Sequence, residues 1–535
     1  MAKKKPKLTL CMVVRNEELL LPRCLESVKE LVDEIIIVDT GSTDSTIQIA
    51  EQAGAIVIQE PWEQNFSKPI NRALREAKGE WIFRLDGDEE LMAEDKGKMR
   101  KLMADPRAEG YILPIISLLN DQNVVEEEVS TFIRLFRNRP EYVYEGLIHE
   151  QVIPSIYRRN PNTVIKSADV RIKHYGYLKE ISDAKNKGKR NREITLEAIK
   201  REPDNGYLRF YMGVEYRRQN ERDQAVVQFA EAMKMLDPKL PWASRCVQAY
   251  TTVLMELGLW EQAMTVVEDG IRLYPDYTDL VYLRGVIHHQ RGDHSKAVSD
   301  FSACIAMGDP VGLNYVVSKG IGGYKSYYAL GLAYRTMGQE EKSIAAYEQS
   351  YQLFPSRSLP LYEIAAMQLS RQSATWIGGY LETIMPQSNK EKYPVIADIL
   401  LSLRKYEAAE KYMAEMVIHH DPNYQFRYLL GGCYRKRGAY PEAIELLSGI
   451  PVASPYYVEA NLHLYACFKY QNEHEKAKEV LLQLKPDEAV FSKLSLLFLE
   501  DSKDILSEGV RRFPDVKSLS LELAKIEEAI QYVGQ

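Results

Sequence analysis

The sequence predicts an α/β domain followed by an all-α solenoid of repeated helix pairs. Over residues 1–178, short apolar runs alternate with segments of helical spacing, which is typical of an α/β domain. Over 206–535 the sequence is typical of almost continuous helix, and small and aromatic residues recur at a fixed interval. We expect the stretch between them, 179–205, to be a basic helical linker or lid.

Apolar runs bounded by polar residues predict the strands of the first domain. Leu21, Cys24, Leu25 and Val28 recur at the spacing of one helix face and predict its first helix. We expect strands over 8–14, 34–38, 55–58, 81–85, 110–119, 131–137 and 168–174. We expect helices over 18–29, 45–52 and 70–77.

The second part of the chain resembles the tetratricopeptide repeat. Ala263 and Ala297, for example, are 34 residues apart, which is the period of that repeat. Each helix pair buries its open face only when the next pair stacks on it, and small residues let the helices approach closely. The insert 311–324 lengthens one repeat, and 360–400 fits poorly, which predicts an irregular pair or a bend.

Composition and charge exclude several classes of protein. The net charge of −7 argues against nucleic acid or an anionic membrane surface as the main partner. No run of 18 apolar residues occurs, so we expect no integral membrane segment. The basic start lacks an apolar stretch and is not a secretory signal. The six scattered cysteines predict core residues in a reducing compartment, and therefore a cytoplasmic location.

The apolar run 81–85 ends directly before two aspartates, Asp86 and Asp88. If the run is a strand, both carboxylates leave the sheet at its carboxyl edge, where open α/β sheets bind ligands. Two carboxylates on a turn can hold Mg²⁺ or Mn²⁺, and that metal can hold a diphosphate. Since such pairs also occur in solvated turns, the interpretation depends on neighbouring motifs.

Two such motifs follow the first and second strands. Segment 14–17 reads Val-Arg-Asn-Glu, and segment 39–44 reads Asp-Thr-Gly-Ser-Thr-Asp. Together with Leu-Asp-Gly-Asp-Glu at 85–89, their order and spacing resemble family 2 glycosyltransferases of the GT-A fold over roughly the first 100 residues. The resemblance implies a Rossmann-like domain that transfers a sugar from a nucleotide diphospho-sugar.

The resemblance assigns residues to the nucleotide sugar. Asp39 is expected to bind the base or ribose, and Glu17 to lie near the nucleoside. Val14, from the first motif, and Asn71, from a later segment, complete the donor-binding set. For Asp44 we favour a simpler role, in which it or the nearby Ser42 caps the helix that starts near residue 45.

The resemblance also assigns the metal site. Asp88 is expected to be the more direct metal ligand, while Asp86 contacts the metal and the sugar or ribose. His174 ends a strand-like run and is expected to complete the metal site. A position in the core is an equally good interpretation for His174, and His149 could take its place as the ligand.

An inverting transfer also needs a base that removes the proton of the acceptor. Glu150, which follows a strand-like segment, is the expected base, with Glu145 and Glu89 as competitors and a helix-start role as the alternative. Relatives often read Phe-Ser-x-Ala-Arg-Asn where this chain has Ile70 in place of the arginine. Arg72 or Lys68 could substitute for it.

The segment 182–192 is basic in an acidic protein. A solvated linker or helix face is the simpler interpretation. The alternative is a lid whose Lys189 and Arg190 contact the diphosphate, since lysine and arginine are the natural partners of phosphate.

A family 2 domain followed by tetratricopeptide helices is similar to bacterial enzymes that glycosylate peptides, such as the sublancin-type S-glycosyltransferases. The segments 65–67, 146–150 and 174–177 support this resemblance. It implies an inverting, metal-dependent transfer of a hexose from a nucleotide sugar, expected to be a UDP-sugar, to a peptide or protein side chain held in the repeat groove. Tyr207 and Tyr211 could face that groove, although helix packing is the better interpretation of any single tyrosine.

Two other functions remain compatible with the sequence. The acceptor could be a cell-envelope glycan, or the chain could be a non-catalytic scaffold that binds peptides through its repeats. The pattern leaves open the sugar, the acceptor atom and whether the chain forms a homo-oligomer.

Overall fold

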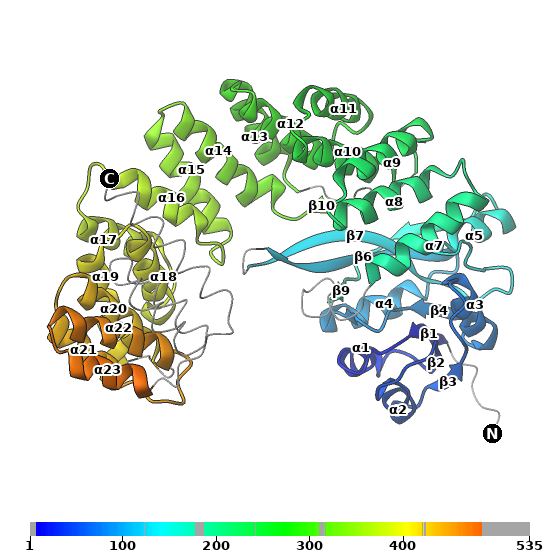
Figure 1. Cartoon of the computed structure of the whole chain (residues 1–535). Coiled ribbons are helices and arrows are strands. Elements are labelled where there is room, and N and C mark those ends of the chain that lie inside the picture. The colour runs from blue at the N-terminus through cyan, green and yellow to red at the C-terminus, as the bar shows by residue number, and fades with distance from the viewer. Residues whose placement is uncertain are drawn as a thin grey trace. The chain divides into compact units, whose positions relative to one another are not determined.

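The computed structural model describes residues 7–483 except 122–123, 177–186, 241, 310–314, 316, 420 and 422–423. The chain divides into two compact units, Met1–Arg357 and Ser358–Gln535, each of which is described by itself. The first unit contains the α/β domain together with the first repeat helices, as Figure 1 shows. The predicted boundaries at 178 and 205 therefore fall within this unit, and they stay predictions.

The α/β domain is built on one mixed sheet with the strand order β3-β2-β1-β4-β7-β6-β9-β5. The first four strands in this order are parallel, β4 pairs with β7 in the antiparallel sense, and β8 pairs with β6. The strands are β1 Leu8–Val14, β2 Glu34–Asp39, β3 Ile56–Gln59, β4 Trp81–Arg84, β5 Glu89–Leu91, β6 Ala108–Asp121, β7 Val124–Arg137, β8 Val164–Ser167 and β9 Ile172–His174. Because β1, β2 and β4 end at the same edge, the three predicted motifs meet there.

Helices cover both faces of the parallel part of the sheet, which explains why β1 is apolar at every position except Thr9. One core cluster includes Leu10, Cys24 and Val28, and the other includes Cys11, Ile36 and Ile70. The domain contains α1 Leu21–Val28, α2 Thr46–Gln52, α3 Ser67–Glu76, η1 Ala93–Asp95, α4 Lys96–Leu102 and α5 Ile153–Arg159.

Several predicted element boundaries were wrong. Strand β7 begins at Val124 rather than at 131, and β6 spans Ala108–Asp121 rather than 110–119. Helix α1 begins at Leu21 rather than at 18, with a proline in its first turn. Helix α3 begins earlier than predicted, at Ser67, and also carries a proline near its start. Strand β9 is shorter than the predicted 168–174, because Arg171 turns back to bind Asp95.

The repeat helices of the first unit pack as antiparallel pairs, as the 34-residue spacing predicted. Gly213 shows why small residues recur, since a β-carbon there would lie 2.7 Å from the ring of Phe229. Gly331 stands in the same relation to Tyr347. The helices are α7 Lys187–Arg201, α8 Gly206–Arg218, α9 Arg222–Lys234, α10 Ala243–Glu256, α11 Trp260–Leu273, α12 Thr278–Gln290, α13 His294–Met307, α14 Ser326–Thr336 and α15 Glu340–Leu353.

The long β6–β7 hairpin reaches from the α/β domain along the repeat helices (Figure 1). The guanidinium of Arg245 in α10 lies 2.8 Å from the carboxylate of Glu128 in β7. The insert between α13 and α14 contributes β10 Val317–Ser318, which pairs with β7. The amide of Ser318 also donates to Asp279 of α12 over 3.1 Å. The hairpin and the repeat are therefore joined by polar contacts and by a short strand.

The second unit is described from residue 358 to 483 with the gaps given above. Its helices are α16 Leu359–Gln368, α17 Ala374–Ile384, α18 Asn389–Ser402, α19 Tyr406–His419, α20 Gln425–Lys436, α21 Tyr440–Ser448, α22 Tyr457–Tyr470 and α23 His474–Gln483. The segment 360–400, which fits the repeat poorly, forms α16, α17 and most of α18.

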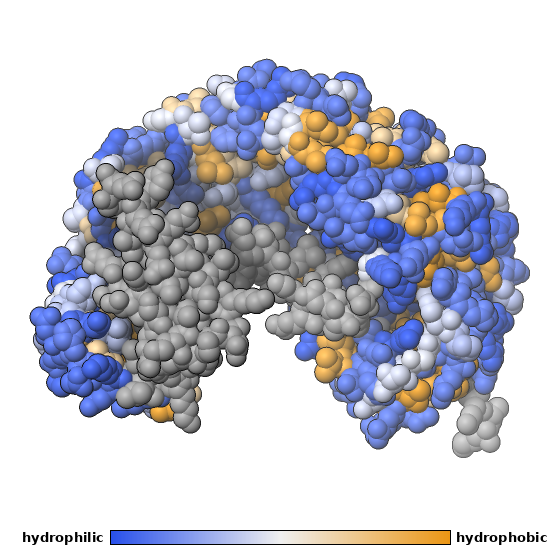
Figure 2. All heavy atoms as spheres, in the orientation of Figure 1, coloured by the Kyte–Doolittle hydropathy of each residue, from blue (hydrophilic) through white to orange (hydrophobic). Residues whose placement is uncertain are grey.

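All six cysteines are buried and free, which confirms the predicted core role. Figure 2 shows that hydrophilic side chains cover much of the drawn face, with hydrophobic residues in smaller groups. Among the helices of the described part of the chain, none is long and apolar enough to cross a membrane.

Candidate active site

The acidic turn between β4 and β5 lies at the carboxyl edge of the sheet, as predicted. Asp88 is buried, with 6 % of its surface exposed, whereas the side chain of Asp86 is 39 % exposed. The carboxylate of Glu89 accepts a hydrogen bond from the amide of Asp86 over 2.9 Å and braces the turn. A β-carbon on Gly87 would lie 2.9 Å from the side chain of Glu17, so the first and third motifs touch here.

The sheet brings Asp88 and His174 together, although 86 residues of sequence separate them. Strand β5 pairs with β9 so that Glu89 lies opposite His174. The Nε2 atom of His174 lies 3.6 Å from Oδ1 of Asp88, and its Nδ1 lies 3.3 Å from the hydroxyl of Ser117. Burial lowers the pKa of His174, but the neighbouring carboxylates, Asp88 above all, raise it more, so the net shift is upward.

Asp88 and His174 fit a divalent metal that takes its remaining ligands from a diphosphate and water. In the described residues, no group of three or more His, Cys, Asp or Glu side chains converges in a way that could hold a metal by itself. Mg²⁺ commonly binds through one or two protein carboxylates plus substrate phosphates, so a two-residue site is sufficient.

Asp86 pairs with two arginines. Its carboxylate lies 3.0 Å from the guanidinium of Arg134 and 3.3 Å from that of Arg84. Burial opposes ionisation of Asp86, but the two arginines outweigh it and lower the pKa to about 2. The structure thus pairs the Asp86 carboxylate with two cations, and its role as a metal ligand stays a prediction.

Arg84 and Arg134 are site residues that the sequence analysis missed. Both are largely buried, with side chains 13 % and 7 % exposed. Arg134 also donates to Glu89 over 2.5 Å. The missed signal was an arginine flanked by large apolar residues, at 82–85 and again at 132–136, because burying such a charge is costly unless it is paired.

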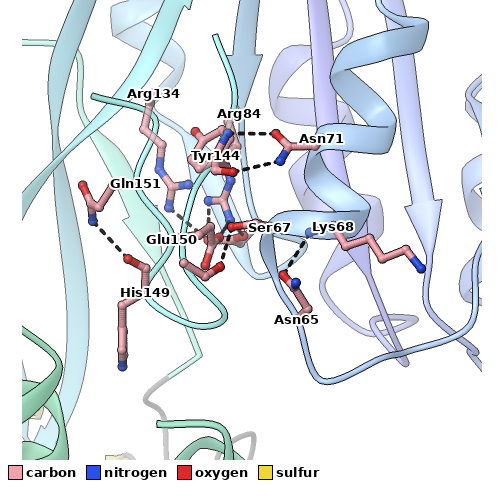
Figure 3. A network of polar contacts seen from close by, with 12 residues as sticks. Asn65, Ser67, Lys68, Asn71, Arg84, Arg134, Tyr144, His149, Glu150 and Gln151 are labelled. Carbon is pink, nitrogen blue, oxygen red and sulfur yellow. Dashed lines mark hydrogen bonds and ion pairs between the residues drawn. The ribbon is translucent and has the colours of Figure 1, made fainter. Parts of the chain in front are cut away.

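Glu150 also pairs with Arg84, and Figure 3 shows the two side chains close together. The Nη2 atom of Arg84 donates to Oε1 of Glu150 over 2.9 Å, and the Glu150 side chain is 11 % exposed. Burial raises the pKa of Glu150 and Arg84 lowers it in part, with a net upward shift. Of the competing bases, Glu89 is committed to Arg134, and Glu145 pairs with Arg158 over 2.7 and 2.8 Å.

The start of α3 holds the loop that carries Glu150 (Figure 3). The side-chain amide of Asn71 donates to the carbonyl of Tyr144 and accepts from the amide of Tyr144, both over 2.8 Å. The hydroxyl of Ser67 donates to the carbonyl of Gly146 over 2.5 Å. Both polar atoms of the Asn71 side chain therefore hold this loop, and its contact with the donor stays a prediction.

The two predicted substitutes for the arginine missing at position 70 pair with nearby glutamates, and their role stays a prediction. Ile70 is buried in the core, with 1 % of its surface exposed. Lys68 pairs with Glu60 and Glu63, and Arg72 pairs with Glu76 along the same helix. The cations nearest to the carboxylates of the site are instead Arg84 and Arg134.

The predicted nucleotide residues form the turn at the ends of β1 and β2. Oδ1 of Asp39 accepts from the amides of Gly41 and Ser42 over 2.9 Å, and its other oxygen accepts from the hydroxyl of Ser42. The carbonyl of Val14 accepts from the amide of Thr40 over 3.1 Å. The Val14 side chain is in the core, and the predicted donor contact of this residue stays a prediction.

Asp44 binds the first residue of α2, although the N-cap residue of this helix is Ser45, whose side chain makes no capping bond. Its Oδ1 accepts a hydrogen bond from the amide of Thr46, the first residue of α2, over 3.0 Å. Its other oxygen accepts from the amide of Glu18 over 3.3 Å, which ties the first motif to the second.

Helix α7 brings Arg190 onto an aromatic pair of the α/β domain. The Arg190 guanidinium lies 5.3 Å from the ring of Phe66 and 5.9 Å from that of Trp62. Burial lowers the pKa of Arg190, and repulsion from Arg15 in the first motif lowers it further. Two repelling arginines are suited to an anion. Lys189, in contrast, is exposed.

A pocket of about 390 Å³ lies beside these residues, lined among others by Trp62, Asn65, Leu147 and Ile194.

His149, the alternative metal ligand, is directed elsewhere, since its ring stacks on Tyr211 with 3.4 Å between the ring centroids. The structure therefore favours His174 over His149 beside Asp88.

Comparison with known proteins supports the division of the chain. Residues 9–187 match the model of Glycosyl transferase family 2. Residues 252–310, 395–458 and 324–357 match tetratricopeptide repeat models. The chain thus carries an N-terminal family 2 glycosyltransferase domain with a mixed α/β sheet, followed by tetratricopeptide repeats.

Three relatives illustrate the similarity. A TPR repeat-containing protein of Synechococcus elongatus is 37% identical over 204 residues, covering 37% of this chain and 50% of the relative. The SPbeta prophage-derived glycosyltransferase SunS of Bacillus subtilis is 27% identical over 228 residues, covering 41% and 52%. An uncharacterized glycosyltransferase of Rickettsia felis is 35% identical over 125 residues, covering 22% and 42%. The chain spans about half the length of the first two relatives.

Proposed function

We propose that the protein is an inverting, metal-dependent glycosyltransferase that transfers a hexose from a UDP-sugar to a peptide or protein side chain. The observation that carries this proposal is the continuous network from Asp86 through Arg84 to Glu150. It places a buried carboxylate with a raised pKa beside the acidic turn of a family 2 domain.

In this reaction Glu150 takes the proton of the acceptor while the acceptor atom forms a bond to C1 of the sugar. The bond from C1 to the diphosphate oxygen breaks, and its electron pair leaves with the nucleoside diphosphate. A base works best when its pKa lies near the working pH, and burial raises the pKa of Glu150 in that direction.

Asp88 and His174 would hold the divalent metal, which supplies Lewis-acid stabilisation of the departing diphosphate. Glu17 lies where the first motif meets the acidic turn, and we propose that it contacts the nucleoside with Asp39 and its turn. Arg190, with Lys189 beside it on α7, would face the diphosphate together with Arg15.

The peptide or protein acceptor rests on the layout of the chain, since tetratricopeptide solenoids commonly offer long surfaces for protein partners. Arg245 and Asp279 already contact the chain's own hairpin and β10. We therefore place the acceptor on repeat surface that these contacts leave uncovered.

The test is nucleotide release from a panel of UDP-sugars, with and without Mn²⁺, by the full chain and by Asp88→Ala. Asp169→Asn is the matched control, because the Asp169 side chain is 77 % exposed and pairs with a surface lysine. Metal-dependent release that Asp88→Ala loses and Asp169→Asn keeps is the expected result. If the wild type neither releases nor binds UDP in the presence of Mn²⁺, the proposal is wrong.

A further inference from the structure

The two neighbours of Glu150 in sequence both contact α8, the first helix of the first repeat pair. The ring of His149 stacks on Tyr211 with a centroid distance of 3.4 Å and an interplanar angle of 13°. The side-chain amide of Gln151 donates to the hydroxyl of Tyr207 over 2.8 Å. Glu150 is therefore bracketed by two contacts to one helix.

The loop needs such support because its backbone is strained. His149 has a φ of 55°, in the left-handed region that residues with a side chain seldom adopt. Such conformations persist only where surrounding contacts impose them. Within the loop, the backbone is closed by the isolated bridge between Glu145 and Gln151.

Helix α8 is a firm support. Tyr207 and Tyr211 are one helical turn apart and meet edge to face at 4.8 Å. On the same helix, Phe210 stacks on Trp242 at 6.0 Å, and Gly213 lies against Phe229. Since α3 holds the beginning of the loop through Asn71 and Ser67, the loop is fixed from both sides.

The stack of His149 on Tyr211 does not depend on charge. Burial and the nearby Arg218 lower the pKa of His149 to about 3, so its ring is neutral at physiological pH. Burial likewise raises the pKa of Tyr207, so its hydroxyl stays neutral while its oxygen accepts from Gln151. Both contacts are therefore present over the whole range in which an enzyme of this kind would work.

We propose that Tyr207 and Tyr211 are positioning residues for the transfer, which hold Glu150 in place through Gln151 and His149. The helical repeat is then part of the catalytic machinery as well as a surface for partners. This inference rests on the proposed role of Glu150 as the base. It goes further, because it assigns a function in the transfer to two residues of the helical repeat.

The experiment compares Tyr211→Ala with Tyr211→Phe in the full chain, using UDP-glucose and Mn²⁺ as the probe. Because a displacement near 1 Å can cost about 100-fold in rate, we expect kcat to fall at least about 10-fold in Tyr211→Ala, with the KM for the donor within about twofold. Tyr211→Phe retains the ring and is expected to keep kcat within about twofold of the wild type.

To distinguish positioning of Glu150 from a merely structural role of Tyr211, the Tyr211→Ala substitution is repeated in a Glu150→Gln background. If Tyr211 acts through Glu150, its removal has little further effect once the base is absent, so the two losses are not additive. Equal losses in both backgrounds, or an equal fall in Tyr211→Ala and Tyr211→Phe, would overturn the proposal.

Hydrogen exchange of residues 144–151 gives a readout that needs no activity. We expect faster amide exchange in this loop for Tyr211→Ala than for Tyr211→Phe, with the α/β sheet unchanged. Unchanged exchange in Tyr211→Ala also contradicts the proposal. If Glu150→Gln keeps full activity, the base assignment fails, and the exchange data still decide whether α8 holds the loop.

Discussion

Arg84 donates a hydrogen bond to Glu150 over 2.9 Å and thereby joins the end of β4 to a loop 66 residues further along the chain. The contact links the carboxylate proposed to act on the acceptor with the acidic turn proposed to bind the donor. Both partners are largely buried, so solvent screens the pair only weakly.

Replacing Arg84 with Gln is expected to move the acid limb of the kcat/KM profile to higher pH. Burial already raises the pKa of Glu150, and Arg84 partly opposes that rise, so removal of the cation raises the pKa further. Activity needs the ionised base and is lost as the pH falls through this pKa. Profiles between about pH 5 and pH 9 check this, with Arg84→Lys as the charge-retaining control. A profile that does not shift would argue against Glu150 as the base.

His174→Gln is expected to lower the affinity for Mn²⁺ about 10- to 100-fold, since the Nε2 atom of His174 lies 3.6 Å from the Asp88 carboxylate. Ser117→Ala, which removes only the partner of Nδ1, is the milder control. The measurement is a Mn²⁺ titration of UDP binding by calorimetry. A variant with wild-type Mn²⁺ affinity and a lower melting temperature would instead place His174 among purely structural residues.

Asn71→Ala is expected to destabilise the first unit by about 1–3 kcal/mol, because it leaves the amide and the carbonyl of Tyr144 without their partners. Thermal unfolding measures this loss, and UDP affinity should change little. The opposite result, a lost nucleotide affinity at an unchanged melting temperature, would support the donor contact that the sequence predicted.

Arg190→Ala is expected to weaken UDP binding about 5- to 10-fold, and more strongly at low salt, because a phosphate relieves the repulsion between Arg190 and Arg15. Lys200→Ala on the same helix is the control, since the Lys200 side chain is 76 % exposed. Equal affinities for the wild type and Arg190→Ala would leave α7 as a linker helix that binds no donor.

Asp279→Asn is expected to stabilise the first unit at pH 8 but not near pH 4. Burial raises the pKa of Asp279 to about 6, above the ordinary value near 4, so the folded state holds the proton more tightly. The stability that the protonated Asp279 carboxyl gives the folded state is present at low pH and is lost as the pH rises from about 4 to 6. Linkage limits this loss in the free energy of unfolding to about 2–3 kcal/mol at pH 8. Melting temperatures at both pH values test the sign, and a variant that is less stable at pH 8 contradicts it.

The sequence by itself determined the order of the elements and the place where the site forms. Apolar runs predicted β1, β2 and β4 almost to the residue, because strands buried on both faces leave little choice of side chain. Since parallel strands end at one edge of a sheet, the sequence alone predicted that the acidic turn lies at that edge. The repeat could be predicted because glycine and alanine must recur wherever paired helices approach closely.

Only the tertiary structure decided which partner each polar side chain takes. The pairing of Asp86 with Arg84 and Arg134, and of Asn71 with Tyr144, joins positions whose spacing in the sequence carries no signal. A side chain capable of binding a ligand can equally satisfy a buried neighbour, and the fold chooses by proximity and burial. For the same reason the contact of His149 with Tyr211 could not be foreseen, since it depends on how the first repeat packs against the α/β domain.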